Sequence, residues 1–184
     1  MSEKAGGYKS LLIYRTSVTI YDLTVLFCEQ FVDKRSRTYD QMVQAARSGK
    51  QNIAEGSKEI SSSSDILLSS VSRSSYTELV EDYGDYLRLK GMSVWDKNDP
   101  RVLRIRAFRE DVNVPTNLIN LSNWTNLNLT QPENFANLML CLCYKQGFLM
   151  DKFLVAKQDK FVKEGGFREN LFKKRREYLQ SKKA

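Results

Sequence analysis

Four carboxylates in the segment 75–90 have a spacing that could support metal binding or proton transfer. They are Glu78, Glu81, Asp82 and Asp85, which share one side of a predicted helix. Helical proteins that bind two metal ions point such carboxylates inward and add Glu-x-x-His pairs. Here the apolar stripe of the same helix lies on the opposite side, as Tyr76, Leu79, Val80, Tyr83 and Leu87. We therefore expect a solvated or salt-bridged acidic face and no metal site.

The chain contains no histidine, so neither a His general base nor a His-ligated metal is possible. Serine is plentiful, but nothing in the sequence supplies the base that a serine nucleophile needs. The sequence also lacks a Gly-x-Ser-x-Gly turn and a Walker-type phosphate loop. We predict that the protein is not an enzyme and has no catalytic residue and no cofactor.

Three cysteines, Cys28, Cys141 and Cys143, are an odd number, and the last two lie too close along one helix to bridge each other. We expect reduced, buried thiols and a cytoplasmic protein. The first ten residues do not resemble a signal peptide. The longest apolar run, residues 138–144, is far shorter than the roughly 20 residues that span a bilayer, so we expect no membrane contact.

Basic residues are the chemistry that remains, because the net charge of +7 favours a polyanionic partner. Residues 161–184 carry eight Lys or Arg and three Glu, a net charge of +5. Four of these cations are consecutive: Lys173, Lys174, Arg175 and Arg176. Such a row can displace counterions from a nucleic-acid backbone and bind RNA or DNA without reading its sequence. The alternative is a tail that only adds solubility.

A second basic set surrounds the predicted helix 36–57. It consists of Lys34, Arg35, Arg37, Arg47, Lys50 and Lys58. On a helical wheel Arg37, Arg47 and Lys58 point outward, as a nucleic-acid surface requires. Lys50 falls within the apolar stripe instead. Either Gly49 shifts the helical register, or Lys50 lies at a subunit interface or in a channel.

Further cations and aromatic residues give weaker indications of nucleic-acid binding. A third basic segment, with Arg101, Arg104, Arg106 and Arg109, has the alternative of pairing with the acidic face. Most Tyr and Phe residues have core spacing, whereas stacking on single strands needs exposed rings. Tyr144, Phe148 and Trp95 are candidates for exposure, but we expect these three in the core as well.

Hydrophobic periodicity predicts an all-α protein. The expected long helices span residues 8–32, 36–57, 62–90 and 130–164. Ser36 is a predicted N-cap, the pairs Ser62/Asp65 and Thr130/Glu133 have capping-box spacing, and Asp99-Pro100 starts a short helix over 101–110. Together these elements predict an antiparallel up-down four-helix bundle over residues 1–164.

Two additions to the four helices are expected. The insertion 91–129 contains the short helix and an Asn-rich, ordered strap over 113–129. The basic tail, 165–184, begins at a Gly165-Gly166 hinge and is expected to be helical in its first half.

The segment 41–56, QMVQAARSGKQNIAEG, should be covered on two sides. One side carries a core-type stripe. The other carries a row of small residues, Ala45, Gly49, Asn52 and Gly56. Glycine inside an exposed helix costs about 1 kcal/mol relative to alanine, so we expect another helix to pack on this row, and we take the row as a reason to expect a homo-oligomer.

This segment, ending in Asn52-Ile53-Ala54-Glu55-Gly56, resembles the four-helix-bundle proteins encoded in intervening sequences of bacterial large-subunit ribosomal RNA genes. That family is similar to the avidity accessory proteins of diversity-generating retroelements. Residues 11–21 and Ser75-Tyr76-Thr77-Glu78-Leu79 extend the resemblance, which covers about residues 8–90. Gly49-Lys50-Gln51 departs from it, because the family usually has Ile-Pro before the Asn-Ile-Ala-Glu-Gly run.

The resemblance implies a pentameric ring with a basic surface, and a structural or assembly role for Glu78. Its retroelement branch implies a reverse transcriptase as partner. Our leading hypothesis is therefore a non-catalytic, homo-oligomeric accessory protein that binds RNA or DNA. The alternative is a protein–protein interaction scaffold that does not bind nucleic acid.

Overall fold

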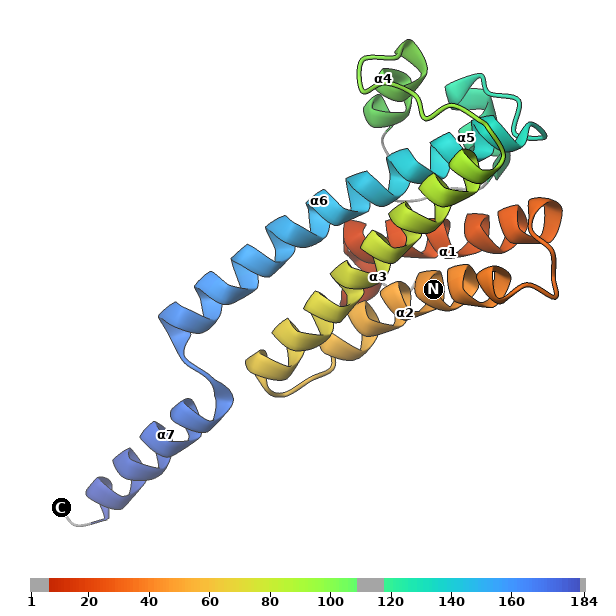
Figure 1. Cartoon of the computed structure of the whole chain (residues 1–184). Helices are drawn as coiled ribbons and strands as arrows, with labels where there is room; N and C mark the ends of the chain where they lie inside the picture. The colour runs from red at the N-terminus through yellow and green to blue at the C-terminus, as the bar shows by residue number, and fades with distance from the viewer. Residues whose placement is uncertain (1–6, 109–117, 183–184) are drawn as a thin grey trace, which may run out of the picture.

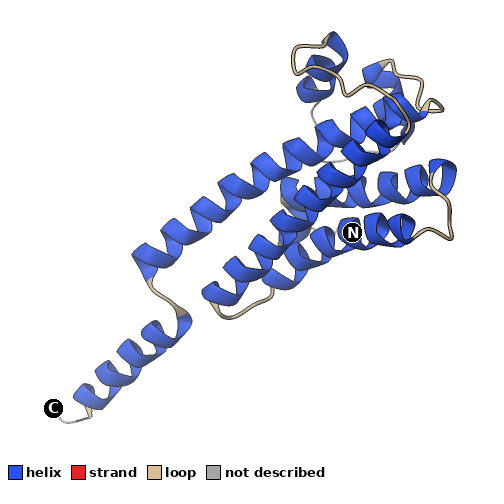
Figure 2. Cartoon of the chain, viewed as in Figure 1, coloured by secondary structure: helices blue, strands red, loops and turns tan. Residues whose placement is uncertain are grey.

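The computed structural model of this chain describes residues 7–108 and 118–182, and this part of the chain is helical without a strand (Figure 2). A short 3-10 turn, Tyr8–Ser10, precedes α1, Leu12–Phe31. α2 spans Arg37–Gly56 and α3 spans Ser62–Leu89. The two short helices are α4, Pro100–Ala107, and α5, Leu118–Thr125. α6 spans Pro132–Glu164 and α7 spans Phe167–Ser181. The prediction of an all-α protein is confirmed.

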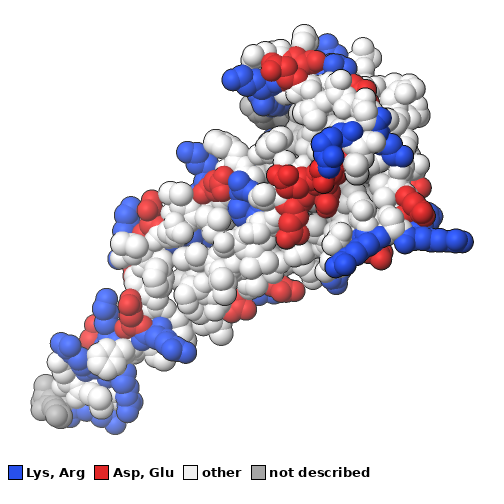
Figure 3. Space-filling view, in the orientation of Figure 1, with Lys and Arg blue, Asp and Glu red and all other residues white. Residues whose placement is uncertain are grey.

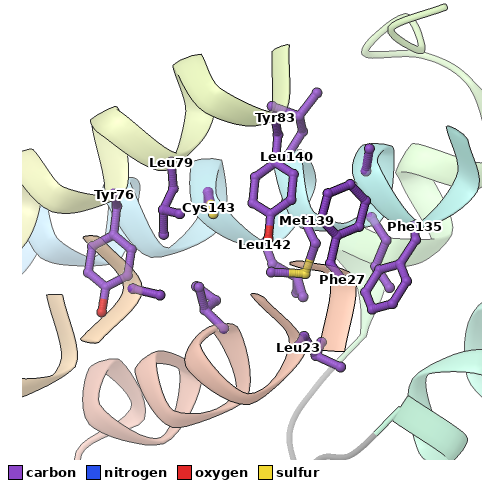
Figure 4. Packing of buried hydrophobic residues seen from close by; sticks show 14 of the residues in the cluster. Leu23, Phe27, Tyr76, Leu79, Tyr83, Phe135, Met139, Leu140, Leu142 and Cys143 are labelled. Atoms are coloured by element: carbon purple, nitrogen blue, oxygen red, sulfur yellow. The ribbon is translucent and has the colours of Figure 1, made fainter. Parts of the chain in front are cut away.

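The four long helices α1, α2, α3 and α6 pack around one hydrophobic core (Figure 1). Phe27 of α1 lies at its centre, with ring centroids 5.1 Å from Tyr83 of α3 and 5.5 Å from Phe135 of α6. Figure 4 shows these rings together with leucines and methionines from the same helices. The Tyr83 hydroxyl donates to Thr24 Oγ1 at 3.0 Å, so its polar end is satisfied inside the core.

Side-chain contacts show how α1 meets α2 and how α3 lies against α6. Cys28 near the end of α1 meets Met42 near the start of α2. Arg73 of α3 pairs with Asp151 of α6, with Nε and Oδ1 2.7 Å apart. Asp65, which precedes Arg73 in α3, pairs with Lys157, which follows Asp151 in α6. The two contacts run in opposite order along α3 and α6, so these two helices are antiparallel.

The helix starts confirm two predicted caps and correct two others. Ser36 accepts the Tyr39 N–H at 3.2 Å, and Asp99 accepts the Arg101 N–H at 2.8 Å ahead of Pro100. The predicted Ser62/Asp65 pair is wrong. The N-cap of α3 is Ser61, and the Asp65 carboxylate pairs with the Lys157 ammonium group instead.

The predicted Thr130/Glu133 capping box is also wrong. The N-cap of α6 is Gln131, which makes no side-chain cap. The Thr130 hydroxyl donates instead to Asn128 Oδ1 at 2.7 Å. Pro132 does occupy the first turn, as predicted, because proline at that position loses no helical hydrogen bond.

The insertion between α3 and α6 is held at several points. Asn137 of α6 accepts the Trp95 N–H at 2.9 Å and donates to the Ser93 carbonyl at 2.9 Å. In the predicted strap the structure places α5, and the buried Leu127 and Leu129 follow it. Residues 109–117 of the predicted short helix and strap lie outside the described residues.

The tail differs from its prediction in two ways. α7 continues to Ser181, well beyond the first half of the tail, and it extends away from the four long helices (Figure 1). The Gly165-Gly166 break is tied by hydrogen bonds: the Gly166 N–H donates to Glu169 Oε2 at 3.0 Å, and Asn170 donates to the Glu164 carbonyl at 3.1 Å. The break is thus a capped turn.

None of the described helices is long and apolar enough to cross a membrane.

Candidate nucleic-acid interface

The small-residue row of α2 is buried by α3 of the same chain. The Ser72 hydroxyl donates to the Gly49 carbonyl at 2.7 Å, and a Cβ on Gly49 would lie 2.7 Å from the Tyr76 ring. A Cβ on Gly56 would lie 2.7 Å from Asp65 Oδ1. The expected close helix contact is therefore present at Gly49 and Gly56, whereas Ala45 is buried and Asn52, half-buried, donates to Ser48 of its own helix. Because α3 of the same chain covers the two glycines, they give no reason to expect self-association.

Lys50 lies against α1. Its Nζ sits 3.8 Å from the centroid of the Tyr21 ring, a cation–π contact. α2 runs without interruption through Gly49, so no register shift occurs. The long aliphatic stem explains how a lysine occupies a stripe position, because it covers apolar surface while its charge stays near solvent.

The second basic set does not form one surface. Lys34 and Arg35 are exposed in the turn before α2, and Arg37 opens α2. Lys58 follows the other end of this 20-residue helix, about 30 Å away, with Nζ 5.9 Å from the Tyr8 ring centroid. Arg47 is exposed between the two ends. These cations are too dispersed to form a single binding patch.

The acidic face of α3 borders a polar groove of about 760 Å³ between α2 and α3. Arg37 and Asp40 line it from α2, and Glu78 and Asp82 line it from α3. Partial burial raises the pKa of Asp82, and repulsion from the neighbouring carboxylates raises this pKa further. Arg88 pairs with Asp85 at 2.8 Å. The residues thus lie on the outer side of α3, as predicted, and Glu78 is exposed.

α7 displays the basic row openly. Lys173, Lys174, Arg175 and Arg176 are all exposed, and α7 has no buried residue. Among the described residues, these four cations form no ion pair. Figure 3 shows Lys and Arg gathered on this projecting end. Large apolar side chains of α7 are also about half exposed or more: Phe167, Leu171, Phe172, Tyr178 and Leu179.

The third basic segment makes local contacts. Arg101 pairs with Asp99 at 2.7 Å and stacks over the Trp95 ring at 3.8 Å, so its partner is not the acidic face. Arg104 donates to the Thr125 carbonyl and Arg106 to the Lys97 carbonyl. Arg109 lies outside the described residues.

Two aromatic residues that the sequence analysis expected in the core are exposed. Tyr144 is 61% and Phe148 60% accessible on the outer side of α6, whereas Trp95 is buried at 8%. One sign of this exposure can be read in the sequence, because Tyr144, Phe148 and Lys152 are spaced by four residues. This spacing puts all three on the same helix face.

The cysteine thiols are protonated and free. Burial raises the pKa of Cys28 to about 12 and that of Cys141 to about 11, and it raises the pKa of Cys143 further still. Thiol chemistry at neutral pH is therefore disfavoured in the folded protein. Of the described residues, no group of three or more Cys, Asp or Glu is arranged to hold a metal ion.

The surface chemistry thus consists of cations on α7, two exposed rings on α6 and an acidic groove between α2 and α3. No protein-family model, curated protein or solved structure matches this chain.

Proposed function

We propose that the protein is a non-catalytic accessory protein that binds nucleic acid through the cations of α7. The observation that supports this proposal is the exposed row Lys173–Arg176 on a helix that projects from the core. Within residues 7–108 and 118–182, no carboxylate pairs with these four adjacent cations, so they keep their full attraction for phosphate. Such binding is sequence-independent and weakens steeply with salt, because it depends on counterion release.

Further parts of the proposal come from the resemblance. The four long helices form an antiparallel up-down bundle of the intervening-sequence type. The protein works as a homo-oligomeric ring, for which the resemblance implies five subunits, with a reverse transcriptase as partner. Because α3 covers the small-residue row, the ring contacts use other surfaces. Exposed apolar residues such as Leu67 and Val71 of α3 are available for them.

Titration of labelled single-stranded RNA at several salt concentrations tests the nucleic-acid proposal. The variant has Lys173, Lys174, Arg175 and Arg176 changed to Ala. Each phosphate contact adds about 0.7 to the slope of log K against log salt for single strands, so losing four flattens that slope by about 2.8. Between 50 and 200 mM salt, this difference corresponds to roughly 50-fold less salt-induced weakening.

A matched control removes four cations from another surface. It has Lys34, Arg35, Arg37 and Arg47 changed to Ala, which alters the net charge equally. The control should retain most of the wild-type slope. If both variants flatten the slope alike, only net charge matters, and the assignment to α7 is wrong. If the wild-type protein binds no RNA at low salt, the whole proposal fails.

The scaffold alternative is favoured by one observation, the uncovered apolar side of α7. A helix of 15 residues is marginal in water without packing, and Phe167, Leu171 and Tyr178 are about half exposed. A partner protein, or the acidic groove of another copy, could cover this side. Leu171→Ser with Tyr178→Ser should then dissociate the assembly, measured as mass in solution. Unchanged mass would count against the scaffold function.

A further inference from the structure

The groove between α2 and α3 carries negative charge over a floor of short side chains. Its described lining includes the carboxylates of Asp40, Glu78 and Asp82 and the guanidinium of Arg37, so three negative charges face one positive charge. The short side chains that also line it are Ala45, Ser48, Ser74 and Ser75. They leave an open volume of about 760 Å³ along the two helices. This groove therefore suits an elongated, basic occupant.

The carboxylates on the α3 side of the groove repel one another. Partial burial raises the pKa of Asp82, and Glu78, Asp85 and Glu81 raise this pKa further, in that order. Figure 3 shows acidic side chains gathered over α3. A cation placed beside these carboxylates reduces their repulsion. An occupant that brings Lys or Arg to this part of the groove is favoured for that reason.

Apolar side chains extend the groove toward the start of α3. Val71 lines the groove and is 44% exposed, and Leu67, one helical turn earlier, is 65% exposed. Glu78 follows Val71 by seven residues, about 10 Å along the helix axis. Residues at this spacing lie on the same face. This face of α3 thus presents apolar groups first and carboxylates two turns later.

One side of α7 presents the complementary order. Phe167, Leu171, Lys174 and Tyr178 follow each other at intervals of three or four residues, so they share a face. All four are exposed. Lys174 follows Phe167 by seven residues, the interval that separates Val71 from Glu78 on α3. Apolar groups meet apolar groups, and cations meet carboxylates, when α7 lies parallel to α3.

We propose that α7 of one copy of this chain lies in the α2–α3 groove of a second copy, parallel to the second copy's α3. The apolar start of α7 then contacts Leu67 and Val71, and its cations contact Glu78 and Asp82. The inference rests on the homo-oligomer of the proposed function and names the contact that forms it. Because the two surfaces differ, the contact is head-to-tail, and repeating it closes a ring or continues as a chain.

The break before α7 directs this helix away from the groove of its own chain. α7 begins beside the start of α3, since Gly166 and Phe167 line a small cavity together with Ser61. The Asn170 side chain donates to the Glu164 carbonyl at 3.1 Å, which ties the first turn of α7 to the end of α6. α7 therefore extends away from the four long helices (Figure 1). Folding it back would break this hydrogen bond, whereas docking on a second copy keeps the bond.

Docking leaves part of the basic row open to nucleic acid. Consecutive residues of a helix point about 100° apart, so Lys173 and Arg176 face away from the side that carries Leu171 and Tyr178. These two cations stay available for phosphate while Lys174 faces the groove. Self-association and the proposed nucleic-acid binding are therefore compatible.

Charge reversal in the whole chain tests the contact. The tail variant is Lys174→Glu with Arg175→Glu. Its matched control, Lys173→Glu with Arg176→Glu, makes the same change in net charge on the other side of α7. The groove variant is Glu78→Lys with Asp82→Lys. Light scattering gives the mass in solution at low salt, where surface charges are least screened, and circular dichroism verifies that each variant is folded.

Wild-type protein and the matched control should both be larger than a monomer. The tail variant and the groove variant should each self-associate about tenfold more weakly or worse, because the reversed charges meet like charges. An equimolar mixture of these two variants should regain the wild-type mass, since each tail then meets a groove of opposite charge. Contact within one chain predicts no such gain on mixing.

Two results overturn the inference while the nucleic-acid proposal stands. One is a wild-type mass that the folded tail and groove variants both retain. The other is a mixture of the two variants that gains no mass. A wild-type chain that stays monomeric at low salt refutes this inference together with the homo-oligomer. The RNA titration described above tests nucleic-acid binding separately, and its failure leaves these masses unaffected.

Discussion

Substituting alanine at two helical glycines should change stability in opposite directions. A Cβ on Gly84 of α3 has no neighbouring atom within 4 Å outside its own helical surroundings. Gly84→Ala therefore gains only helix propensity and should stabilise the protein by about 0.5–1 kcal/mol. A Cβ on Gly49 of α2 would lie 2.7 Å from Tyr76 Cζ and 2.9 Å from its hydroxyl.

The free-energy cost of Gly49→Ala depends on whether the Tyr76 ring can move aside. Its side chain is completely buried, so the ring cannot swing into solvent to make room. Adding atoms to a packed core typically costs about 1–3 kcal/mol, and the propensity gain offsets up to about 1 kcal/mol. Gly49→Ala should therefore destabilise the protein by about 1–2 kcal/mol. The α2–α3 contact, including the Ser72 hydrogen bond to the Gly49 carbonyl, would widen.

Urea unfolding and thermal unfolding, both followed by circular dichroism at 222 nm, measure the two changes, with Gly84→Ala as the matched control. For a chain of this length, each kcal/mol corresponds to about 2–4 °C in Tm. The two variants should thus shift Tm to opposite sides of the wild-type value. If Gly49→Ala stabilises the protein as much as Gly84→Ala does, the close packing of α2 on α3 is refuted.

Two other predictions concern pH and the insertion. Burial raises the pKa of Cys28 from 9.0 to about 12 and that of Cys141 from 9.0 to about 11. As the pH rises, the unfolded chain therefore loses these protons before the folded protein does. The free energy of unfolding that the buried thiols contribute is fully present below pH 9 and falls from pH 9 to pH 11. A urea midpoint that rises over this range would contradict the burial. Asn137→Ala leaves the buried Trp95 N–H without its acceptor and should cost about 1–3 kcal/mol. Unchanged hydrogen-exchange protection of the Trp95 amide would rule out this role of Asn137.

Local periodicity was enough to predict the helices, because each long helix carries an apolar stripe that is readable from its own residues. The caps of α3 and α6 were missed for a physical reason. A serine run offers several oxygens at nearly equivalent positions. In addition, Asp65 forms an ion pair with Lys157, which lies 92 residues away in the sequence, so local spacing cannot identify this partner.

The candidate site was only partly predictable. The cations of α7 are exposed because α7 has no buried residue and extends away from the other described helices, and their density in the sequence indicated this. The exposure of Tyr144 and Phe148 was only weakly indicated by their four-residue spacing with Lys152, since the segment 138–144 is apolar on nearly every side. Which side of α6 stays open depends on where α1 and α4 pack, and that is a tertiary property.

Because α7 projects from the core, the molecule carries a concentration of positive charge at one end. Its 15 residues correspond to about 22 Å, well beyond the roughly 8 Å over which physiological salt screens charge. The carboxylates around Asp82 belong to α3, one of the four long helices from which α7 extends away (Figure 1), so they do not neutralise the cationic end. Within about one screening length of the surface, a polyanion would therefore be attracted more strongly to the α7 end than to the rest of the molecule.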